Sequence, residues 1–496
     1  MSIGKKLFPG LLLCALVAPR VTGKVLVRWT QRAMPPAKSL GVSELALPWS
    51  AGAEALMDAA RDRGYRVYLE VTPQQVAAVA EMGTKEGFAG LILEPGPAEQ
   101  RDAEELLRKL RIAYPKFTFR LLLSEGKQPQ RRGQLVYERD GILQVSSPTA
   151  QPWVDSNLAV VRFAQAFHPG STPLYTFAWS ASDPLQKQLG PGAAEYALAV
   201  AEAGAFHADL ILDLPENLQN SLAHDDPDAW TTWKQVQRFL GFYVRGNRDS
   251  LQLVTSVSVW TDSEKGSYEA VNLMARHNIS FRVLRKEDLN TRSLKDVDIL
   301  VAFSTPEKEQ IEIISDFVAE GGTAVLVNVH GSFPWQSTNS VRRTEQAVVY
   351  GVGKGRVIEF SGPIIDPETF AQDIRRLMAK ERIPISLWNS LTTLVIPYRD
   401  PRTDHTILEL INYEEEPLQF QVQVKGSFAS IRYETPEHGC CETLTPRHVN
   451  GFTEFVVPNL VIGGRLYLQH AAGQKDGHAS NNQKRTGDHA EKSLSQ

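Results

Sequence analysis

Three carboxylates in the first half of the chain stand where short apolar segments end. They are Glu70 in YLEV, Glu94 in LILEP and Asp213 in LILDLP. An unpaired carboxylate is costly to bury, so each needs either a partner or solvent. Two carboxylates that flank a cleft can cleave a glycosidic bond. One protonates the leaving oxygen, and the other acts as nucleophile or activates water. A capping or salt-bridging role is the competing explanation for each.

Four tryptophans form a second candidate set. Trp29, Trp49 and Trp179 end apolar runs or lie one residue beyond them, and Trp153 follows another run after a short loop. Indoles gathered at one rim would offer flat apolar walls with an N–H donor, a surface that stacks on sugar rings. The alternative is that some of them only roof a core.

The elements that must position these residues alternate between short apolar strands and amphipathic helices from residue 24 to residue 245. Repeated βα units of this length predict a (β/α)8 barrel, whose active site lies at the carboxyl ends of the strands. The eight predicted strands are Val25–Trp29, Leu45–Pro48, Val67–Val71, Gly90–Glu94, Phe117–Leu123, Ile142–Ser146, Leu174–Trp179 and Leu210–Asp213. Residues 124–141 are predicted to form a long loop, with a hairpin as an alternative, and a miscount there would shift every later strand by one.

The middle of the chain has the pattern of a parallel sheet. Residues 297–331 give an apolar strand, a helix predicted to begin near Thr305, a stop at Gly321 and Gly322, and a second apolar strand. Short alternating strands separated by turn residues follow over 385–470 and predict a small antiparallel β-sandwich. The polar residues 471–496 are predicted to be a disordered tail.

The middle segment resembles the flavodoxin-like domain that follows the catalytic barrel in multidomain β-galactosidases, where it is called the trimerisation domain. The resemblance covers residues 252–380 and is carried by LKDVDILVAFS, FVAEGGTAVLV, GVGKGRVIEFSG and FAQDIRRLM. It implies a multidomain glycoside hydrolase that acts on a carbohydrate and could form homo-oligomers through this domain. Class I glutamine amidotransferases share the general topology. Their chemistry needs a nucleophilic cysteine, but Ser304 and Thr305 occupy the expected turn, and His330 has no cysteine to serve.

The resemblance also implies roles at the barrel. Glu94 ends the fourth predicted strand, where that family carries its acid/base glutamate, although Leu93 replaces the family's asparagine. The nucleophile is expected at the end of the seventh strand, but the predicted seventh strand, YTFAWS, has no carboxylate. Two hypotheses remain. Glu94 could pair with Asp213 or with Glu70, and opposite strands favour the wide separation of inverting enzymes. Alternatively, the barrel has lost its chemistry and only binds carbohydrate or acts as a scaffold.

The chain has 496 residues, 42% of them hydrophobic and 22% charged, which is typical of a globular protein. Residues 1–23 have the pattern of a signal peptide with a cut ahead of Lys24, so export is predicted. The rival is a membrane anchor, but the apolar core is shorter than the roughly 20 residues that a span needs. Apart from this segment we expect no membrane span.

Other partners are not indicated by the sequence. The formal charge of −4 and the lack of a basic stripe argue against nucleic acid. Around Cys440 and Cys441, His438 and His448 match no standard metal-ligand spacing. The GVGKG segment lacks the spacing of a phosphate loop. We therefore expect neither a metal nor a cofactor.

Overall fold

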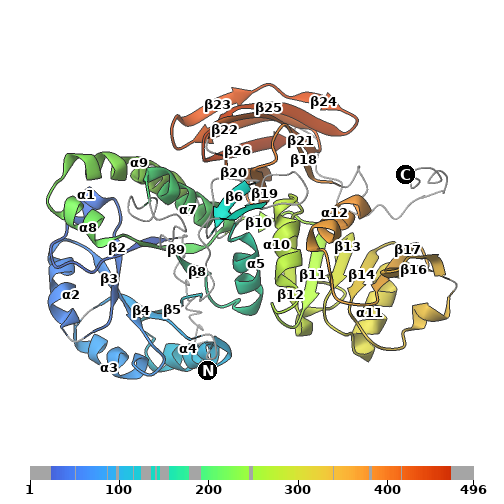
Figure 1. Cartoon of the computed structure of the whole chain (residues 1–496), viewed down its shortest axis with the longest axis horizontal. Coiled ribbons are helices and arrows are strands. Elements are labelled where there is room, and N and C mark those ends of the chain that lie inside the picture. The colour runs from blue at the N-terminus through green and yellow to red at the C-terminus, as the bar shows by residue number, and fades with distance from the viewer. Residues whose placement is uncertain are drawn as a thin grey trace, which may run out of the picture.

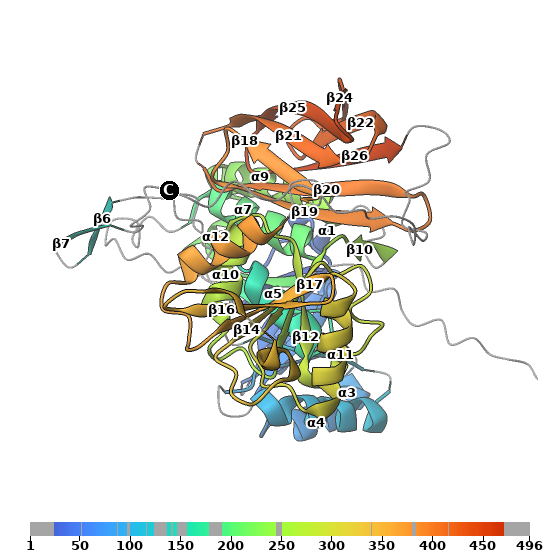
Figure 2. The same cartoon turned by 90° about the vertical axis from the view of Figure 1, so that its right-hand side faces the viewer.

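The computed structural model describes residues 24–50, 52–86, 88–96, 100–115, 117–123, 136–139, 142–145, 156–177, 191–244, 250–338, 340–378, 383–414 and 416–470. They form three bodies: a helix-wrapped parallel barrel, a mostly parallel sheet with helices on both faces, and a pair of antiparallel sheets (Figure 1). The barrel and the middle sheet lie side by side. The antiparallel pair lies across one end of both (Figure 2).

Seven parallel strands build the barrel sheet, in the order β5-β4-β3-β2-β1-β9-β8. An isolated bridge between Leu122 and Leu174 and a hydrogen bond from Leu123 N to Leu174 O join its two edges, so the barrel closes. The strands are β1 (Val25–Arg28), β2 (Glu44–Pro48), β3 (Arg66–Val71), β4 (Gly90–Leu93), β5 (Thr118–Leu121), β8 (Leu174–Phe177) and β9 (Asp209–Asp213). The helices are α1 (Ala37–Leu40), α2 (Ala53–Asp62), α3 (Val76–Glu86), α4 (Gln100–Ala113), α5 (Leu158–Phe167), α7 (Ala193–Phe206), α8 (Glu216–Ala223) and α9 (Pro227–Val244).

Of the segment predicted as the sixth barrel strand, Ile142–Ser146, the described residues 142–145 do not pair with the barrel. Ile142–Val145 does form a strand, β7, but it pairs antiparallel with β6 (Val136–Arg139) in a separate two-stranded sheet. A short apolar run looks the same whichever partner it takes, so its pattern could not distinguish a hairpin from a barrel strand. Within the described residues the barrel therefore has seven strands, and β9 is the seventh in chain order.

The barrel interior is built in layers because side chains alternate along each strand. Its apolar middle layer takes one residue from each strand or its immediate end: Leu26, Ala46, Tyr68, Ile92, Leu122, Leu174 and Ile211. Two residues further along their strands, the same face carries Arg28, Glu70, Glu94 and Asp213. Two residues earlier it carries Lys24, Glu44, Arg66, Arg120 and Asp209. Charged layers therefore close both ends of an apolar interior.

The middle sheet has the order β12-β11-β13-β14-β17-β16-β15, with five parallel strands followed by two antiparallel ones. Its helix α11 (Lys308–Ala319) begins later than predicted because Glu307 keeps an extended backbone and caps the helix. The strands are β11 (Val257–Thr261), β12 (Phe281–Arg285), β13 (Ile299–Ala302), β14 (Thr323–Val327), β15 (Ser340–Arg343), β16 (Ala347–Val352) and β17 (Gly355–Phe360). The other helices are α10 (Tyr268–Arg276) and α12 (Pro367–Leu377).

The C-terminal strands form a β-sandwich of two sheets, ordered β10-β19-β20-β26-β22-β23 and β18-β21-β25-β24. The first strand, β10, precedes the middle sheet in the chain, so the segment that leaves the barrel joins the sandwich before the middle sheet begins. The bounds are β10 (Gln252–Leu253), β18 (Ile385–Trp388), β19 (Thr393–Asp400), β20 (His405–Asn412), β21 (Leu418–Lys425), β22 (Phe428–Thr435), β23 (Gly439–Leu444), β24 (Arg447–Val449), β25 (Phe452–Leu460) and β26 (Gly463–His470).

Candidate active site at the barrel mouth

The layer at the carboxyl ends of the barrel strands brings Glu70, Glu94, Asp213 and Arg28 together. Arg28 ends β1, Glu70 lies near the end of β3, Glu94 directly follows β4 and Asp213 ends β9. β4 and β9 lie opposite each other, because β5 and β8 separate them on one side and β1, β2 and β3 on the other. All three predicted carboxylates therefore belong to one mouth.

Arg28 binds two of these carboxylates. Its Nε donates to Glu70 Oε2 at 2.8 Å and its Nη2 to Glu70 Oε1 at 2.6 Å. Its Nη1 donates to Asp213 Oδ2 at 2.8 Å. The Glu70 contact is a bidentate pair, which uses both carboxylate oxygens, whereas Asp213 is held through one oxygen.

Burial distinguishes the three acids. The Glu70 side chain is 5% exposed and that of Asp213 is 32% exposed. Glu94 is exposed, and its backbone N–H donates to Val71 O at 2.9 Å, which continues the β3–β4 pairing by one residue. Glu94 and Asp213 can therefore reach solvent, while Glu70 is enclosed with its arginine.

The electrostatics of the mouth follow from this arrangement. Burial is the main cause that raises the pKa of Glu70, the bond to Arg28 acts to lower it, and the nearby charges of Glu94 and Asp213 raise it further. Burial acts to lower the pKa of Arg28, but the bonds to Glu70 and Asp213 outweigh burial and raise it. Arg28 therefore stays charged and partly offsets an acidic site.

Two of the four predicted rim tryptophans, Trp29 and Trp49, lie among the described residues. Trp29 is 0% exposed, and its Nε1 donates to Ala33 O at 3.1 Å, so it packs the core and offers no face to a ligand. Its prediction as a sugar platform is wrong in this structure because the chain folds back over the indole. Trp49 is half-buried and packs against the same core. Trp153 and Trp179 lie outside the described residues.

The rival sites in the other two bodies lack the groups they would need. Ser304 is buried and His330 is exposed, at the ends of different strands, and the sequence has no cysteine between residues 250 and 378. Cys440 and Cys441 form a disulfide with each other. Glu434, and neither His438 nor His448, is the neighbour whose ligand atom lies within 4.8 Å of both sulfurs.

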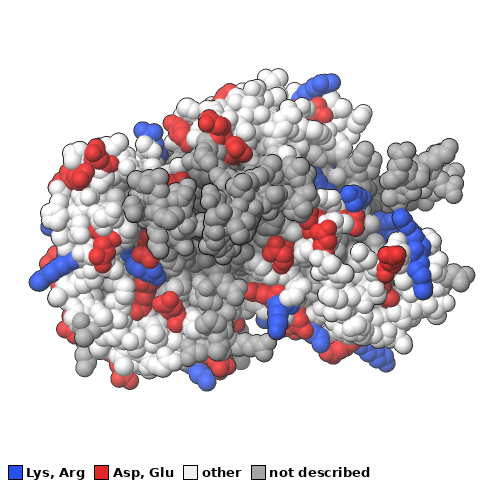
Figure 3. Space-filling view, in the orientation of Figure 1, with Lys and Arg blue, Asp and Glu red and all other residues white. Residues whose placement is uncertain are grey.

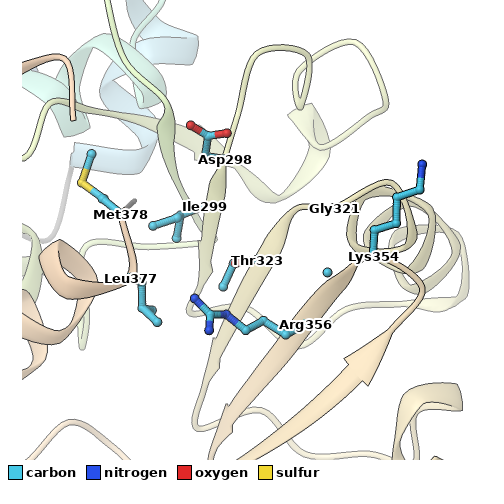
Figure 4. Close-up of a pocket in the computed structure, with 9 residues that line it drawn as sticks. Asp298, Ile299, Gly321, Thr323, Lys354, Arg356, Leu377 and Met378 are labelled. Atoms are coloured by element: carbon cyan, nitrogen blue, oxygen red, sulfur yellow. The ribbon is translucent and has the colours of Figure 1, made fainter. Parts of the chain in front are cut away.

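The middle sheet contains a cavity of about 300 Å³. Figure 4 shows Asp298, Thr323 and Arg356 around it, with the guanidinium of Arg356 directed toward Leu377 and Lys354 pointing away. The lining residues precede or begin β13, β14 and β17 or lie at the end of α12, so the cavity opens at the amino ends of these strands. Ligands of such sheets bind outside the carboxyl ends, so this cavity is a weaker candidate than the barrel mouth.

The charge on the visible surface (Figure 3) and the length of the described helices bear on nucleic-acid and membrane partners. Acidic and basic side chains are interspersed over the part of the face that is coloured in Figure 3. Among the described residues, no helix is long and apolar enough to cross a membrane.

Arg28 is the site residue that sequence reasoning missed. Its signal is an arginine that ends the apolar strand VLVR, as the three acids end theirs. A charged group at such a position needs a partner, but its partners lie 42 and 185 residues away in the sequence.

Among known proteins, the likenesses of this chain are to solved structures. No family model matches the sequence, and no curated protein matches it. Among solved structures, the chain is similar to an α-L-fucosidase from Paenibacillus thiaminolyticus, with a TM-score of 0.58 and 12% identity over 91% of this chain and 100% of that one. It is also similar to Gan42B, a GH42 β-galactosidase from G. stearothermophilus, with a TM-score of 0.53 and 10% identity over 87% and 95% of the two chains.

A third similar structure is a β-galactosidase from a Rahnella species, with a TM-score of 0.51 and 10% identity over 89% of this chain and 99% of that one. Each of these likenesses spans nearly the whole length of both chains, so it includes the order of the bodies as well as the barrel. The chain therefore has the fold of the multidomain glycoside hydrolases that are built on a TIM barrel.

Proposed function

We propose that the protein is a glycoside hydrolase that cleaves a β-linked oligo- or polysaccharide at the barrel mouth. Glu94 is the acid that protonates the leaving oxygen, and Asp213 is the second carboxylate. The observation that carries the proposal is Asp213, held by Arg28 at the end of β9, opposite the exposed Glu94 that follows β4.

The positions of the two acids in the barrel bear on these roles. The resemblance to β-galactosidases implies an acid at the end of the fourth strand and a nucleophile at the end of the seventh. Among the described residues β9 is the last barrel strand and pairs with β1, so Asp213 lies at the same rim beside Arg28, one strand after the position that the resemblance gives the nucleophile. The separation of the two acids decides whether the anomeric configuration is retained or inverted.

The ion pairs favour Asp213 over Glu70 as the partner of Glu94. Arg28 binds both oxygens of Glu70, and a buried bidentate pair must break before either oxygen can attack a sugar. Asp213 uses only Oδ2 for Arg28, and no described residue forms a hydrogen bond with its Oδ1. Glu70 is then a positioning residue, because it fixes the arginine that orients Asp213.

The fold of similar solved structures is also consistent with this proposal, since they include β-galactosidases and an α-L-fucosidase. The sugar is left open. The test is therefore hydrolysis of a panel of aryl glycosides and plant oligosaccharides by the chain from Lys24 onward, with the anomer of the first product followed by NMR.

Glu94→Gln and Asp213→Asn each remove one carboxylate with little change of shape. We expect either change to lower kcat by about 100-fold or more on substrates with poor leaving groups, because general acid catalysis alone contributes that much. Glu105→Gln, on the exposed face of α4, is the matched control and should keep full activity. Full activity in both mouth variants at unchanged melting temperature would refute the roles. If the wild type hydrolyses no substrate but a sugar raises its melting temperature, the protein binds carbohydrate without cleaving it.

Two further proposals concern the rest of the chain. The parallel strands of the middle sheet run in the order second, first, third, fourth, fifth, and this supports a flavodoxin-like domain. We propose that it mediates contact between subunits, which sedimentation at several concentrations would test. We also propose export, with residues 1–23 as the signal.

A further inference from the structure

The amino end of the barrel holds a second cluster of charges, far from the mouth. It consists of Lys24, Glu44, Arg66, Arg120 and Asp209, the layer below the apolar interior. Glu44 accepts from Lys24 Nζ at 3.0 Å and lies 3.2 Å from Arg66 Nη1 and 3.4 Å from Arg120 Nη2. Three cations therefore surround Glu44.

In the described part of the chain, Asp209 has fewer charged partners than Glu44. Its Oδ1 accepts a hydrogen bond from the backbone N of Lys24 at 2.6 Å. Arg120 Nη1 lies 3.2 Å from its Oδ2, but that nitrogen is buried and makes no hydrogen bond. Among the described residues, the Lys24 backbone is therefore the hydrogen-bond donor that this carboxylate has.

Burial makes this shortage costly. Asp209 is 2% exposed, and burial raises its pKa to about 6, although Arg120 and Lys24 act to lower it and Glu44 raises it again. The cations already present do not fully compensate the ionised carboxylate. One more positive charge at Oδ1 would stabilise it.

Cleavage of the chain just before Lys24 would place that charge. The segment before Lys24 has the pattern of a signal peptide, with Val21 and Gly23 at the positions that precede a cut. Hydrolysis of the Gly23–Lys24 peptide bond adds the hydroxyl of water to the Gly23 carbonyl carbon and its hydrogen to the Lys24 nitrogen. The new α-amine takes a further proton from solvent and becomes an ammonium group.

We propose that the chain is processed immediately before Lys24, and that the α-ammonium group released there pairs with buried Asp209 and completes the charged layer of the barrel. Processing then stabilises the folded barrel as well as releasing the protein. The Lys24 side chain and Arg66 are directed at Glu44, so they cannot substitute for the new charge at Oδ1. The inference does not depend on hydrolysis at the mouth.

Pairing between the α-ammonium group and Asp209 makes the stability of the folded chain depend on pH. An ammonium group that gains a carboxylate partner has a higher pKa in the folded chain than the ordinary value of about 7.7 to 8.0. Its stabilisation is therefore present below that ordinary value while Asp209 is ionised, and it is lost as the pH rises through the folded pKa of the amine. Asp209 and Glu44 face this amine as anions, and Arg120 and the Lys24 side chain face it as cations.

The first test is the mass of the exported protein, which should correspond to a chain that begins at Lys24. The second compares the melting temperature of that chain with one carrying Gly-Ser before Lys24. The extension keeps an N–H at Lys24 and moves the α-ammonium group two residues away from that nitrogen. We expect the free-amine chain to melt about 2 to 4 °C higher at pH 6.5, and the difference to vanish at high pH and in an Asp209→Asn background.

A third measurement does not require Asp209→Asn to fold. The rate at which an acylating reagent modifies the α-amine at pH 8 should be about fivefold lower in the folded chain than in urea if pairing raises the pKa by one unit. A mature chain that begins elsewhere, equal melting temperatures at pH 6.5, or equal acylation rates in folded and unfolded chains would each overturn the proposal.

Discussion

At the scale of single residues, charge pairing inside the barrel decides what each acid can do. Of the residues that the structure describes, the mouth layer has three carboxylates and one arginine, and Arg28 divides its donors between Glu70 and Asp213. Burial makes these contacts consequential, because a buried charge without its partner costs far more than a surface pair contributes. Arg28 is thus both a structural and a positioning residue.

Arg28→Met should destabilise the protein by about 3–5 kcal/mol, because it leaves Glu70 buried without its partner. The melting temperature checks this. The double variant Arg28→Met with Glu70→Gln should recover much of the loss, since no buried charge remains. Arg61→Met, which breaks the exposed pair with Asp58 on α2, is the control and should change stability by less than about 1 kcal/mol. A double variant as unstable as Arg28→Met alone would contradict this account.

At the scale of elements, the outer wall of the barrel depends on close approach between helices. Helix α7 is rich in alanine and is buried along its length from Tyr196 to Phe206. It packs against α9, where Tyr243 covers Gly204. Small side chains on α7 allow it to lie between the barrel sheet, α9 and the sandwich strand β20.

Gly204→Ala should destabilise the protein although alanine is the better helix former by about 1 kcal/mol. A Cβ at this position would overlap the ring of Tyr243, and overpacking of this kind costs about 1–3 kcal/mol. The net loss should appear as a lower melting temperature. Gly362→Ala, where nothing lies within 4 Å of the added carbon, is the control. A rise in melting temperature for Gly204→Ala would mean that helix propensity outweighs packing here.

At the scale of the whole molecule, the three bodies share one core. The main hydrophobic cluster includes residues of the barrel, the middle sheet and the sandwich. Polar contacts reinforce it: Tyr398 of the sandwich donates to Ala205 O at 2.9 Å and stacks on His207. The guanidinium of Arg465 lies 5.0 Å from the ring of Phe242 on α9. The sandwich is therefore a brace for the barrel.

Tyr413→Phe tests this brace. The Tyr413 hydroxyl donates to Glu202 Oε1 at 2.5 Å, and Glu202 is a fully buried residue of α7. Loss of a donor to a buried carboxylate should cost about 1–3 kcal/mol. Calorimetry should therefore show a lower melting temperature for the barrel and sandwich together. Tyr433→Phe, which removes a bond to Asn459 O inside the sandwich, is the control. If only the sandwich transition moved in Tyr413→Phe, the two bodies would be uncoupled.

Much of the architecture could be read from local patterns. Apolar runs between amphipathic helices predicted the seven strands that form the barrel, and alternating strands predicted the sandwich. The same pattern placed Glu70, Glu94 and Asp213 at strand ends, since the period of two along a strand is a local property. A strand end and its facing direction need no knowledge of distant residues.

What the sequence by itself determined was therefore the type and order of the elements and the position of each acid within its own strand. Only the tertiary structure decided that Ile142–Val145 joins a hairpin, that Trp29 is buried, and that Arg28 binds Glu70 and Asp213. The physical reason is that each outcome depends on which segments meet in space. Pairing across 42 or 185 residues leaves no periodic trace in the chain on either side.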